Sequence, residues 1–155
     1  MASESTARSD DLAGGLTGGC FCGAVRYRAE AVFDAGYCHC SMCRRISGAP
    51  AVAWFSVRDA QFRVTRGEPA ALRSSEHFTR FFCSRCGTHL FGRDDLPPPA
   101  KVGSRLVSAM LGTLDDPSGV VPQIHQWWSD RMPWWADAPS LTTFEHGTIT
   151  HPAER

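Results

Sequence analysis

Three cysteines lie within six residues of the chain, and their spacing is typical of a metal site. Residues 38–43 read CHCSMC, so Cys38, Cys40 and Cys43 form a CxCxxC cluster. Tetrahedral coordination of zinc by thiolates needs sulfur atoms a few ångströms apart, and turns built on CxC and CxxC supply that separation. No fourth cysteine is near in the sequence. The cluster therefore predicts a zinc site with three protein ligands.

The other four cysteines form two pairs, and each pair is followed directly by a glycine. The pairs are Cys20 with Cys22 and Cys83 with Cys86. In a metal-binding turn, backbone amides hydrogen-bond to the sulfur atoms, and glycine adopts the positive φ angle that such a turn needs. We therefore assign these four cysteines to one structural zinc. Four ligands close the coordination sphere, whereas three ligands with one free position are the arrangement of catalytic zinc.

Other interpretations of the cysteines stay open. Disulfides need an oxidising compartment and an even set of partners. The CxxC at 83–86 also has the spacing of a thioredoxin-like redox pair, but that motif opens a helix, and strand-like residues flank this one. His39 could close the three-cysteine site as a fourth ligand, although in an extended chain its side chain points away from the thiols. Clustered thiols near arginine also oxidise readily once a metal is lost.

Length and charge limit the class of protein. A chain of 155 residues predicts a single domain. The formal net charge is +0 and the sequence pI is about 7.0. The protein therefore has no overall positive charge that would attract nucleic acid or anionic lipid, and neither partner is expected. No apolar run approaches the ~20 residues of a membrane helix, and the polar start lacks the core of a signal peptide. We expect a cytoplasmic protein with reduced thiols.

The chain is organised as short strands between turn residues, with no long amphipathic helical pattern. We expect a disordered tail at 1–13, a zinc-binding domain at 14–145 and a C-terminal tail at 146–155. Strands are expected at 24–29, 36–39, 51–57, 62–65, 71–74, 78–82, 89–91, 105–111 and 123–128. Short helical turns are expected at 41–45, with Ser41 as the N-cap, and at 57–61.

The joint spacing of all seven cysteines resembles that of the glutathione-dependent formaldehyde-activating enzyme (GFA) family, whose domain is shared with centromere protein V. The matching segments are 18–27 (GGCFCGAVRY), 38–45 (CHCSMCRR), 82–88 (FCSRCGT) and, more loosely, 125–134 (HQWWSDRMPW). The resemblance extends over about residues 16–145. It implies a mainly β, antiparallel fold of the β-tent type with short helical turns.

The resemblance also implies chemistry. In the family, the cysteines matching Cys20, Cys22, Cys83 and Cys86 hold a structural zinc, and those matching Cys38, Cys40 and Cys43 hold a catalytic zinc, giving two Zn²⁺ ions per chain. The family adds the thiol of glutathione to formaldehyde to form S-hydroxymethylglutathione, a carbon-sulfur lyase reaction. We therefore expect a zinc enzyme acting on a thiol adduct. The alternative is a non-catalytic binding module in which both zinc ions are structural.

Several further residues are candidates for substrate contacts. Arg44 and Arg45 follow the three-cysteine cluster directly, and guanidinium groups bind carboxylates such as those of glutathione. They could equally compensate the negative charge of a thiolate site. The five tryptophans (Trp54, Trp127, Trp128, Trp134 and Trp135) could wall a cleft or pack as core and rim. His89 and His125 are interpreted as structural histidines and are not assigned to catalysis.

Overall fold

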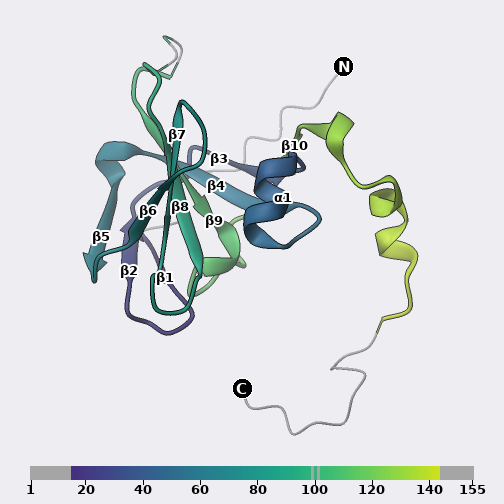
Figure 1. The fold of residues 1–155 in the computed structure, drawn as a ribbon, viewed down its shortest axis with the longest axis horizontal. Coiled ribbons are helices and arrows are strands. Elements are labelled where there is room, and N and C mark those ends of the chain that lie inside the picture. The colour runs from purple at the N-terminus through teal and green to yellow at the C-terminus, as the bar shows by residue number, and fades with distance from the viewer. Residues whose placement is uncertain (1–14, 99, 101, 144–155) are drawn as a thin grey trace, which may run out of the picture.

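The computed structural model describes residues 15–98, 100 and 102–143. The tails expected at 1–13 and 146–155 lie outside these described residues. The strands form two sheets (Figure 1). The three-stranded sheet has the order β1 (Leu16–Gly19), β2 (Arg26–Ala29), β5 (Phe62–Arg66). The seven-stranded sheet has the order β10 (Ile124–Gln126), β3 (Asp34–Cys38), β4 (Val52–Arg58), β9 (Leu106–Met110), β8 (His89–Asp94), β7 (Phe78–Phe82), β6 (Ala70–Arg73).

The predicted mainly β, antiparallel architecture with short helices is confirmed. Neighbouring strands pair antiparallel, apart from β10, which pairs parallel with β3. The helix α1 (Ser41–Ser47) follows β3 and contacts β4. The 3-10 helices are η2 (Asp59–Gln61), η3 (Leu111–Thr113), η4 (Trp128–Asp130) and η5 (Pro133–Ser140). Of the helices in the described part of the chain, none is long and apolar enough to cross a membrane.

The core lies between the two sheets and contains a cluster of aromatic rings among aliphatic side chains. Across the seven-stranded sheet, Phe55, Ala109, Phe91 and Phe81 are successive register partners, so they lie in one row on one face. Phe91 stacks on Phe81 with ring centroids 4.6 Å apart and meets Phe62 of β5 at 4.7 Å. These contacts fasten the small sheet onto the inner face of the large one.

The opposite face of the large sheet carries a different set of side chains. Cys38 pairs with Val52, and Trp54, two residues along β4, pairs with Met110 of β9. Ser108 pairs with Gly92, which in turn pairs with Arg80 of β7. Because side chains alternate along a strand, these residues share the face turned away from the core. This face therefore positions a cysteine, a tryptophan and an arginine together.

Two helical expectations need correction. The N-cap of α1 is Cys40, not Ser41, because the backbone of Cys40 is extended and its sulfur accepts from the Cys43 amide. The turn expected at 57–61 is confined to η2, since Arg58 is extended and still pairs with Leu106 in the sheet. The strand β1 was not expected, because two of its four residues are glycines.

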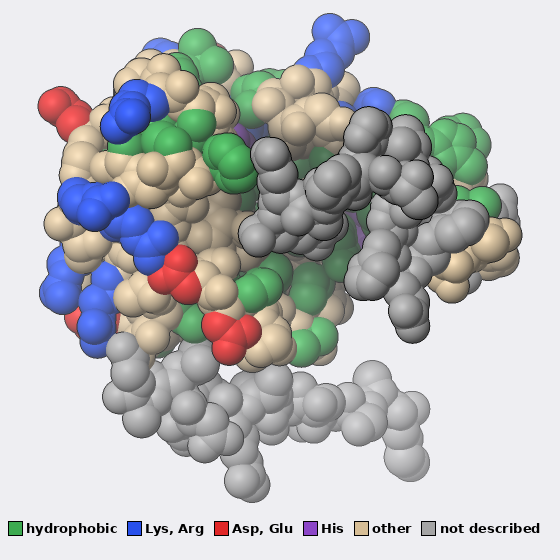
Figure 2. Space-filling view, turned by 90° about the horizontal axis from the view of Figure 1, so that it is seen from below, with side chains coloured by type: hydrophobic (Ala, Val, Ile, Leu, Met, Phe, Trp, Pro, Cys, Tyr) green, Lys and Arg blue, Asp and Glu red, His purple; other side chains and the backbone are tan. Residues whose placement is uncertain are grey.

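Charged side chains of both signs lie on the surface. In the space-filling view, Arg side chains gather on one side of the molecule with Asp and Glu side chains next to them, and hydrophobic side chains form separate patches (Figure 2). Ion pairs such as Arg93 with Asp59, 3.0 Å apart, are half-exposed. The exposed surface therefore shows local pairing of charges, in agreement with the formal net charge of +0.

Candidate metal centres and the adjoining cleft

The four cysteines predicted to share a structural zinc come together in the structure. Their sulfur atoms all lie within 4.8 Å of one another, with Cys22 at 3.6 Å from Cys20 and 3.8 Å from Cys83. Zinc-sulfur bonds of about 2.3 Å in a tetrahedron place the sulfurs about 3.8 Å apart. The donor set and its spacing therefore fit zinc.

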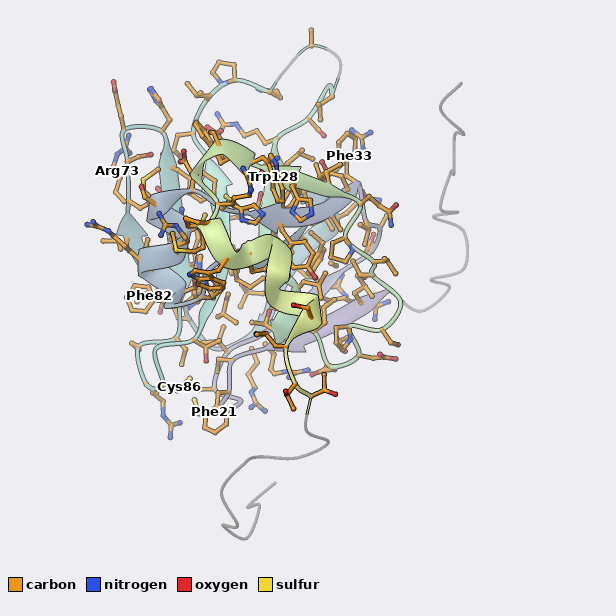
Figure 3. All side chains as sticks on the ribbon, turned by 90° about the vertical axis from the view of Figure 1, so that its right-hand side faces the viewer. Phe21, Phe33, Arg73, Phe82, Cys86 and Trp128 are labelled. Atoms are coloured by element: carbon orange, nitrogen blue, oxygen red, sulfur yellow. The ribbon has the colours of Figure 1, made fainter. Side chains whose placement is uncertain are left out.

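The backbone around these four cysteines forms two tight turns. Gly23 donates to the Cys20 carbonyl at 2.9 Å and Gly87 to the Cys83 carbonyl at 2.8 Å, and these glycines have φ angles of 72° and 74°. The positive φ angles expected from the sequence are thus present. The Phe21 amide donates to the Thr88 hydroxyl at 3.1 Å, joining one turn to the other. Phe21 and Cys86 lie together at one end of the molecule (Figure 3).

Hydrogen bonds to the sulfur atoms support the thiolate form. The Val25 amide donates to Cys20 Sγ at 3.2 Å, and the Thr88 hydroxyl lies 3.2 Å from Cys86 Sγ. The Thr88 hydroxyl and amide lower the pKa of Cys86 to about 5. Because zinc binds the thiolate and not the thiol, this lowered pKa favours the metal-ligating form of Cys86.

The second group consists of the three cysteines expected from the CxCxxC motif. Cys38 ends β3, Cys40 caps α1 and Cys43 lies in its first turn, and their sulfurs lie within 4.8 Å of one another. The Cys43 amide donates to Cys40 Sγ at 3.3 Å. Among the described residues, no further His, Cys, Asp or Glu belongs to this group. The three thiols could hold a metal ion, and a tetrahedral ion held by three protein ligands would have one position left for another molecule.

His39 takes no part in this group. Its side chain is fully buried, and its Nε2 lies 2.9 Å from Nδ1 of His125 on β10. Trp128 and Trp135 meet its ring edge-on at centroid distances of 5.3 and 5.1 Å. Burial lowers the pKa of His39. The histidine pair therefore ties β3 to β10 and to the tryptophan segment, in agreement with the structural interpretation of His125.

A residue that the sequence did not indicate lies against the three thiols. Arg80 of β7 is 5% exposed, and its Nη2 lies 3.5 Å from Cys43 Sγ. Its Nε donates to the Ser74 hydroxyl at 3.0 Å, and its guanidinium lies over the Phe78 ring. Of the described carboxylates, none forms an ion pair with Arg80. A buried cation needs a counter-charge, and the thiolate cluster provides one.

Arg80 provides a positive charge for a metal held at this site. A zinc ion with three thiolates would carry a formal charge of about −1, which the guanidinium of Arg80 would neutralise. The thiol of Cys38 and the charge of Arg80 together lower the pKa of Cys43 to about 5. The sequence signal for Arg80 is an arginine within the aromatic strand FTRFF, which is recognisable only once the strand is placed beside the cysteines.

The two arginines predicted from the sequence to contact substrate lie elsewhere. The Arg44 Nε donates to the His39 carbonyl at 3.2 Å, and its Nη1 lies 3.6 Å from Met132 Sδ. Arg45 is exposed on the surface of α1. Neither lines the cleft described next. Their role in binding the carboxylates of a thiol stays a prediction.

A cleft of about 340 Å³ opens beside the three thiols. It is lined by Cys38, Cys40, Met42, Cys43, Val52, Trp54, Phe78, Arg80, Asp94, Ser108, Met110, Gln126 and Trp127. The volume is that of a small-molecule site. A larger hollow of about 420 Å³ lies between α1 and the Cys86 turn and includes His89, whose pKa burial lowers to about 4. Cys86, the cysteine among the residues that line this hollow, belongs to the four-cysteine group, so we assign the chemistry to the smaller cleft.

Removal of the Arg80 charge is expected to weaken metal binding at the three-cysteine site alone. In Arg80→Met, the negative metal centre loses its buried counter-charge, so we expect zinc affinity there to fall about tenfold or more. Competition with a chromophoric chelator measures this, and the four-cysteine site serves as the internal reference. Arg80→Lys keeps the charge and should retain more affinity, and Arg45→Met is the surface control. Unchanged zinc affinity in Arg80→Met would exclude the counter-charge role.

Fold and site together define a mainly β protein with two cysteine groups, one of four and one of three residues, that could each hold a metal ion. The family profile described as glutathione-dependent formaldehyde-activating enzyme matches residues 15–130. The chain therefore belongs to that family, as the sequence resemblance implied.

Individual relatives agree with this assignment. A Halomonas elongata protein, named as a glutathione-dependent formaldehyde-activating enzyme, is 34% identical over 85 residues, 49% of this chain and 54% of that protein. The chain thus matches about half the length of this relative. The crystal structure of a Rhodobacter sphaeroides protein is similar in fold, with a TM-score of 0.53 and 27% identity over 70% of this chain and 97% of the other.

Proposed function

We propose that this protein is a zinc-dependent carbon-sulfur lyase that acts on the adduct of a thiol and a small aldehyde. S-hydroxymethylglutathione, formed from glutathione and formaldehyde, is the reference substrate, because the family and the Halomonas relative are named for that chemistry. Since glutathione is a thiol of the reducing cytoplasm, we place the activity there. The observation that carries the proposal is the three-cysteine group, which faces a cleft and has no fourth ligand among the described residues.

The chemistry adds an S–H bond across a carbonyl group. A sulfur-carbon bond forms, the π pair of the carbonyl moves to oxygen, and the thiol proton ends on that oxygen, so no oxidant or reductant is needed. Cys38, Cys40 and Cys43 would hold the zinc ion, and its chemistry when bound would be to stabilise the thiolate form of a substrate thiol at neutral pH.

Side chains of the protein would then act on the bound thiol and aldehyde. Arg80 holds a positive charge next to the thiolates, which offsets the additional negative charge that a substrate thiolate brings. Trp54 and Met110 form apolar walls of the cleft, which limit the access of water. The Trp54 indole N–H is buried and has no partner among the described residues. It is therefore a donor that a carbonyl or hydroxyl oxygen of the substrate could use.

The test is exchange between free formaldehyde and its thiol adduct. We expect the zinc-loaded protein to accelerate this exchange about tenfold or more over buffer, because the thiolate and carbonyl are held together. Exchange of ¹³C-labelled formaldehyde with glutathione, followed by NMR, measures the rate above the spontaneous reaction. Removal of zinc with a chelator should abolish the acceleration, and added zinc should restore it. No acceleration with any thiol while both sites contain zinc would instead support the binding-module alternative.

A further inference from the structure

A second hollow, of about 250 Å³, adjoins the cleft beside the three thiols. Phe78, Asp94 and Ser108 line both the cleft and this hollow. The hollow lies where β8 ends at Asp94 and β9 begins at Leu106. We call it the Arg105 hollow, after the arginine in its lining. A ligand with its sulfur at the three thiols could therefore extend past Phe78 into the Arg105 hollow.

Phe78 connects this hollow to the three-cysteine group through a single side chain. Phe78 and Arg80 lie two residues apart on β7, so their side chains share one face of the sheet. The Arg80 Nη2 lies 3.5 Å from Cys43 Sγ, and its Cζ lies 4.9 Å from the centre of the Phe78 ring. The strands β7, β8 and β9, which line the hollow, are adjacent in the sheet. The hollow and the three thiols therefore lie next to each other on the same face.

One acidic and one basic side chain line the Arg105 hollow without pairing with each other. Among the described residues, neither Asp94 nor Arg105 takes part in an ion pair. Asp94 does not neutralise Arg80 either, although both line the cleft. Asp94 Oδ1 accepts a hydrogen bond from the Leu96 amide at 2.9 Å, which orients the carboxylate. Both charges are therefore available to a ligand that carries the complementary pair.

An α-amino acid group carries that pair of charges. Its ammonium would bind the Asp94 carboxylate, and its carboxylate would bind the Arg105 guanidinium, which forms bidentate contacts with carboxylates. The residues Ser104 and Ser108 add hydroxyl groups to the lining. Glutathione has such a group at its γ-glutamyl end, about 9 Å from its sulfur when the chain is extended. The sulfur can thus lie at the three thiols while the amino acid group lies beyond Phe78.

We propose that the Arg105 hollow is the subsite for the α-amino acid group of the thiol substrate, with Asp94 binding the ammonium and Arg105 binding the carboxylate. This inference rests on the proposed function, because it assigns a part of the substrate of that same site. Arg80 cannot provide this recognition, since its guanidinium is engaged by Ser74 and Cys43. The subsite distinguishes a thiol with a γ-glutamyl group from a shorter thiol.

The binding experiment uses the zinc-loaded full chain and isothermal titration calorimetry. The probes are glutathione, N-acetylglutathione, in which the ammonium is replaced by a neutral amide, and N-acetylcysteinylglycine, which lacks the γ-glutamyl group. We expect glutathione to bind about tenfold more tightly than N-acetylcysteinylglycine, because hydrogen bonds between charged groups are the strong ones. N-acetylglutathione should keep about threefold or less of that advantage, because Asp94 then has no cation to bind.

The variants remove one charge each. In Asp94→Asn, which keeps an oxygen for the Leu96 amide, and in Arg105→Met, the advantage of glutathione should fall to about threefold or less. Binding of N-acetylcysteinylglycine should be unchanged in both variants. The controls are Asp95→Asn, which alters the neighbouring carboxylate outside both the cleft and the hollow, and Arg63→Met on the small sheet. Both controls should match the wild type.

The possible outcomes separate this inference from the proposed function. If glutathione and N-acetylcysteinylglycine bind equally, or if both variants weaken all three thiols equally, the subsite is wrong and the thiol site stands. Loss of the preference in one variant alone contradicts recognition by the pair. If no thiol binds to the chain with two zinc ions, the open thiol site itself is wrong, and the subsite falls with it. A preference for glutathione that is lost in both variants and kept in both controls supports the proposal.

Discussion

Replacement of Cys83 by serine is expected to unfold much of the protein. Cys83 is 1% exposed and follows β7 of the large sheet, whereas its partners Cys20 and Cys22 lie in the turn after β1 of the small sheet. A zinc bound by all four cysteines therefore links the two sheets. Because metal-binding energy at a structural site is folding energy, loss of one ligand should lower the free energy of unfolding by about 4 kcal/mol or more. Urea unfolding followed by circular dichroism, together with zinc content, measures this.

The control for this variant lies in the same turn. Ser84 is exposed between the two cysteines, and Ser84→Ala should change stability by no more than about 0.5 kcal/mol. Both variants alter one small side chain of the turn, and they differ in whether a ligand is lost. A Cys83→Ser protein that keeps two zinc ions and the unfolding midpoint of the wild type would show that the four cysteines do not stabilise the fold through a metal.

Both cysteine groups could be predicted from the sequence, because the geometry within each CxC or CxxC turn is local. Ligands separated by one or two residues within a turn are brought together by the turn itself, as Cys40 and Cys43 are. The glycines after the paired cysteines indicated positive φ, and Gly23 and Gly87 have it. The meeting of the two distant pairs was inferred from the glycine that follows each of them, and the sulfur positions confirm that the four cysteines come together.

Strands were predicted where aromatic or β-branched residues alternate with other residues. The strand β1 was missed because its glycines interrupt this alternation. The range 78–82 agrees with β7 at both ends. In β1, glycine is needed at position 18, because a β-carbon there would clash with the Tyr27 ring of the paired strand. That requirement comes from packing between strands. The four residues of β1 alone do not show it.

The cleft could not be predicted, because it depends on the order of strands across the whole sheet. Arg80 reaches Cys43 only because β3, β4, β9, β8 and β7 are neighbours in that order. Arg44, adjacent to the cysteine in sequence, bonds instead to the His39 carbonyl. Trp127 was expected within a strand at 123–128, yet β10 ends at Gln126 and Trp127 turns into the left-handed region. Proximity in sequence was thus a poor guide to proximity at the site.

Replacement of Cys43 by serine is expected to remove activity and leave the fold intact. A serine hydroxyl stays protonated at neutral pH and is a poor zinc ligand, so the three-cysteine site should lose its metal. We expect the rate of formaldehyde–thiol exchange to fall to that of buffer, which is the loss of the whole acceleration of about tenfold or more. Cys43 lies in α1, which is beside the sheet and outside the core between the sheets. The free energy of unfolding should therefore change by about 1 kcal/mol or less.

Cys43 is a better choice for this experiment than Cys40, because Cys40 also caps α1 and its replacement would alter helix stability. The matched comparison is Cys83→Ser, which makes the same chemical change at the other site. If the open centre carries the chemistry, Cys43→Ser keeps one zinc and a cooperative unfolding transition but no activity, whereas Cys83→Ser loses the transition itself. Full exchange activity in a Cys43→Ser protein with one zinc would place the chemistry elsewhere, because the remaining metal would be enclosed by four thiolates with no position for a substrate.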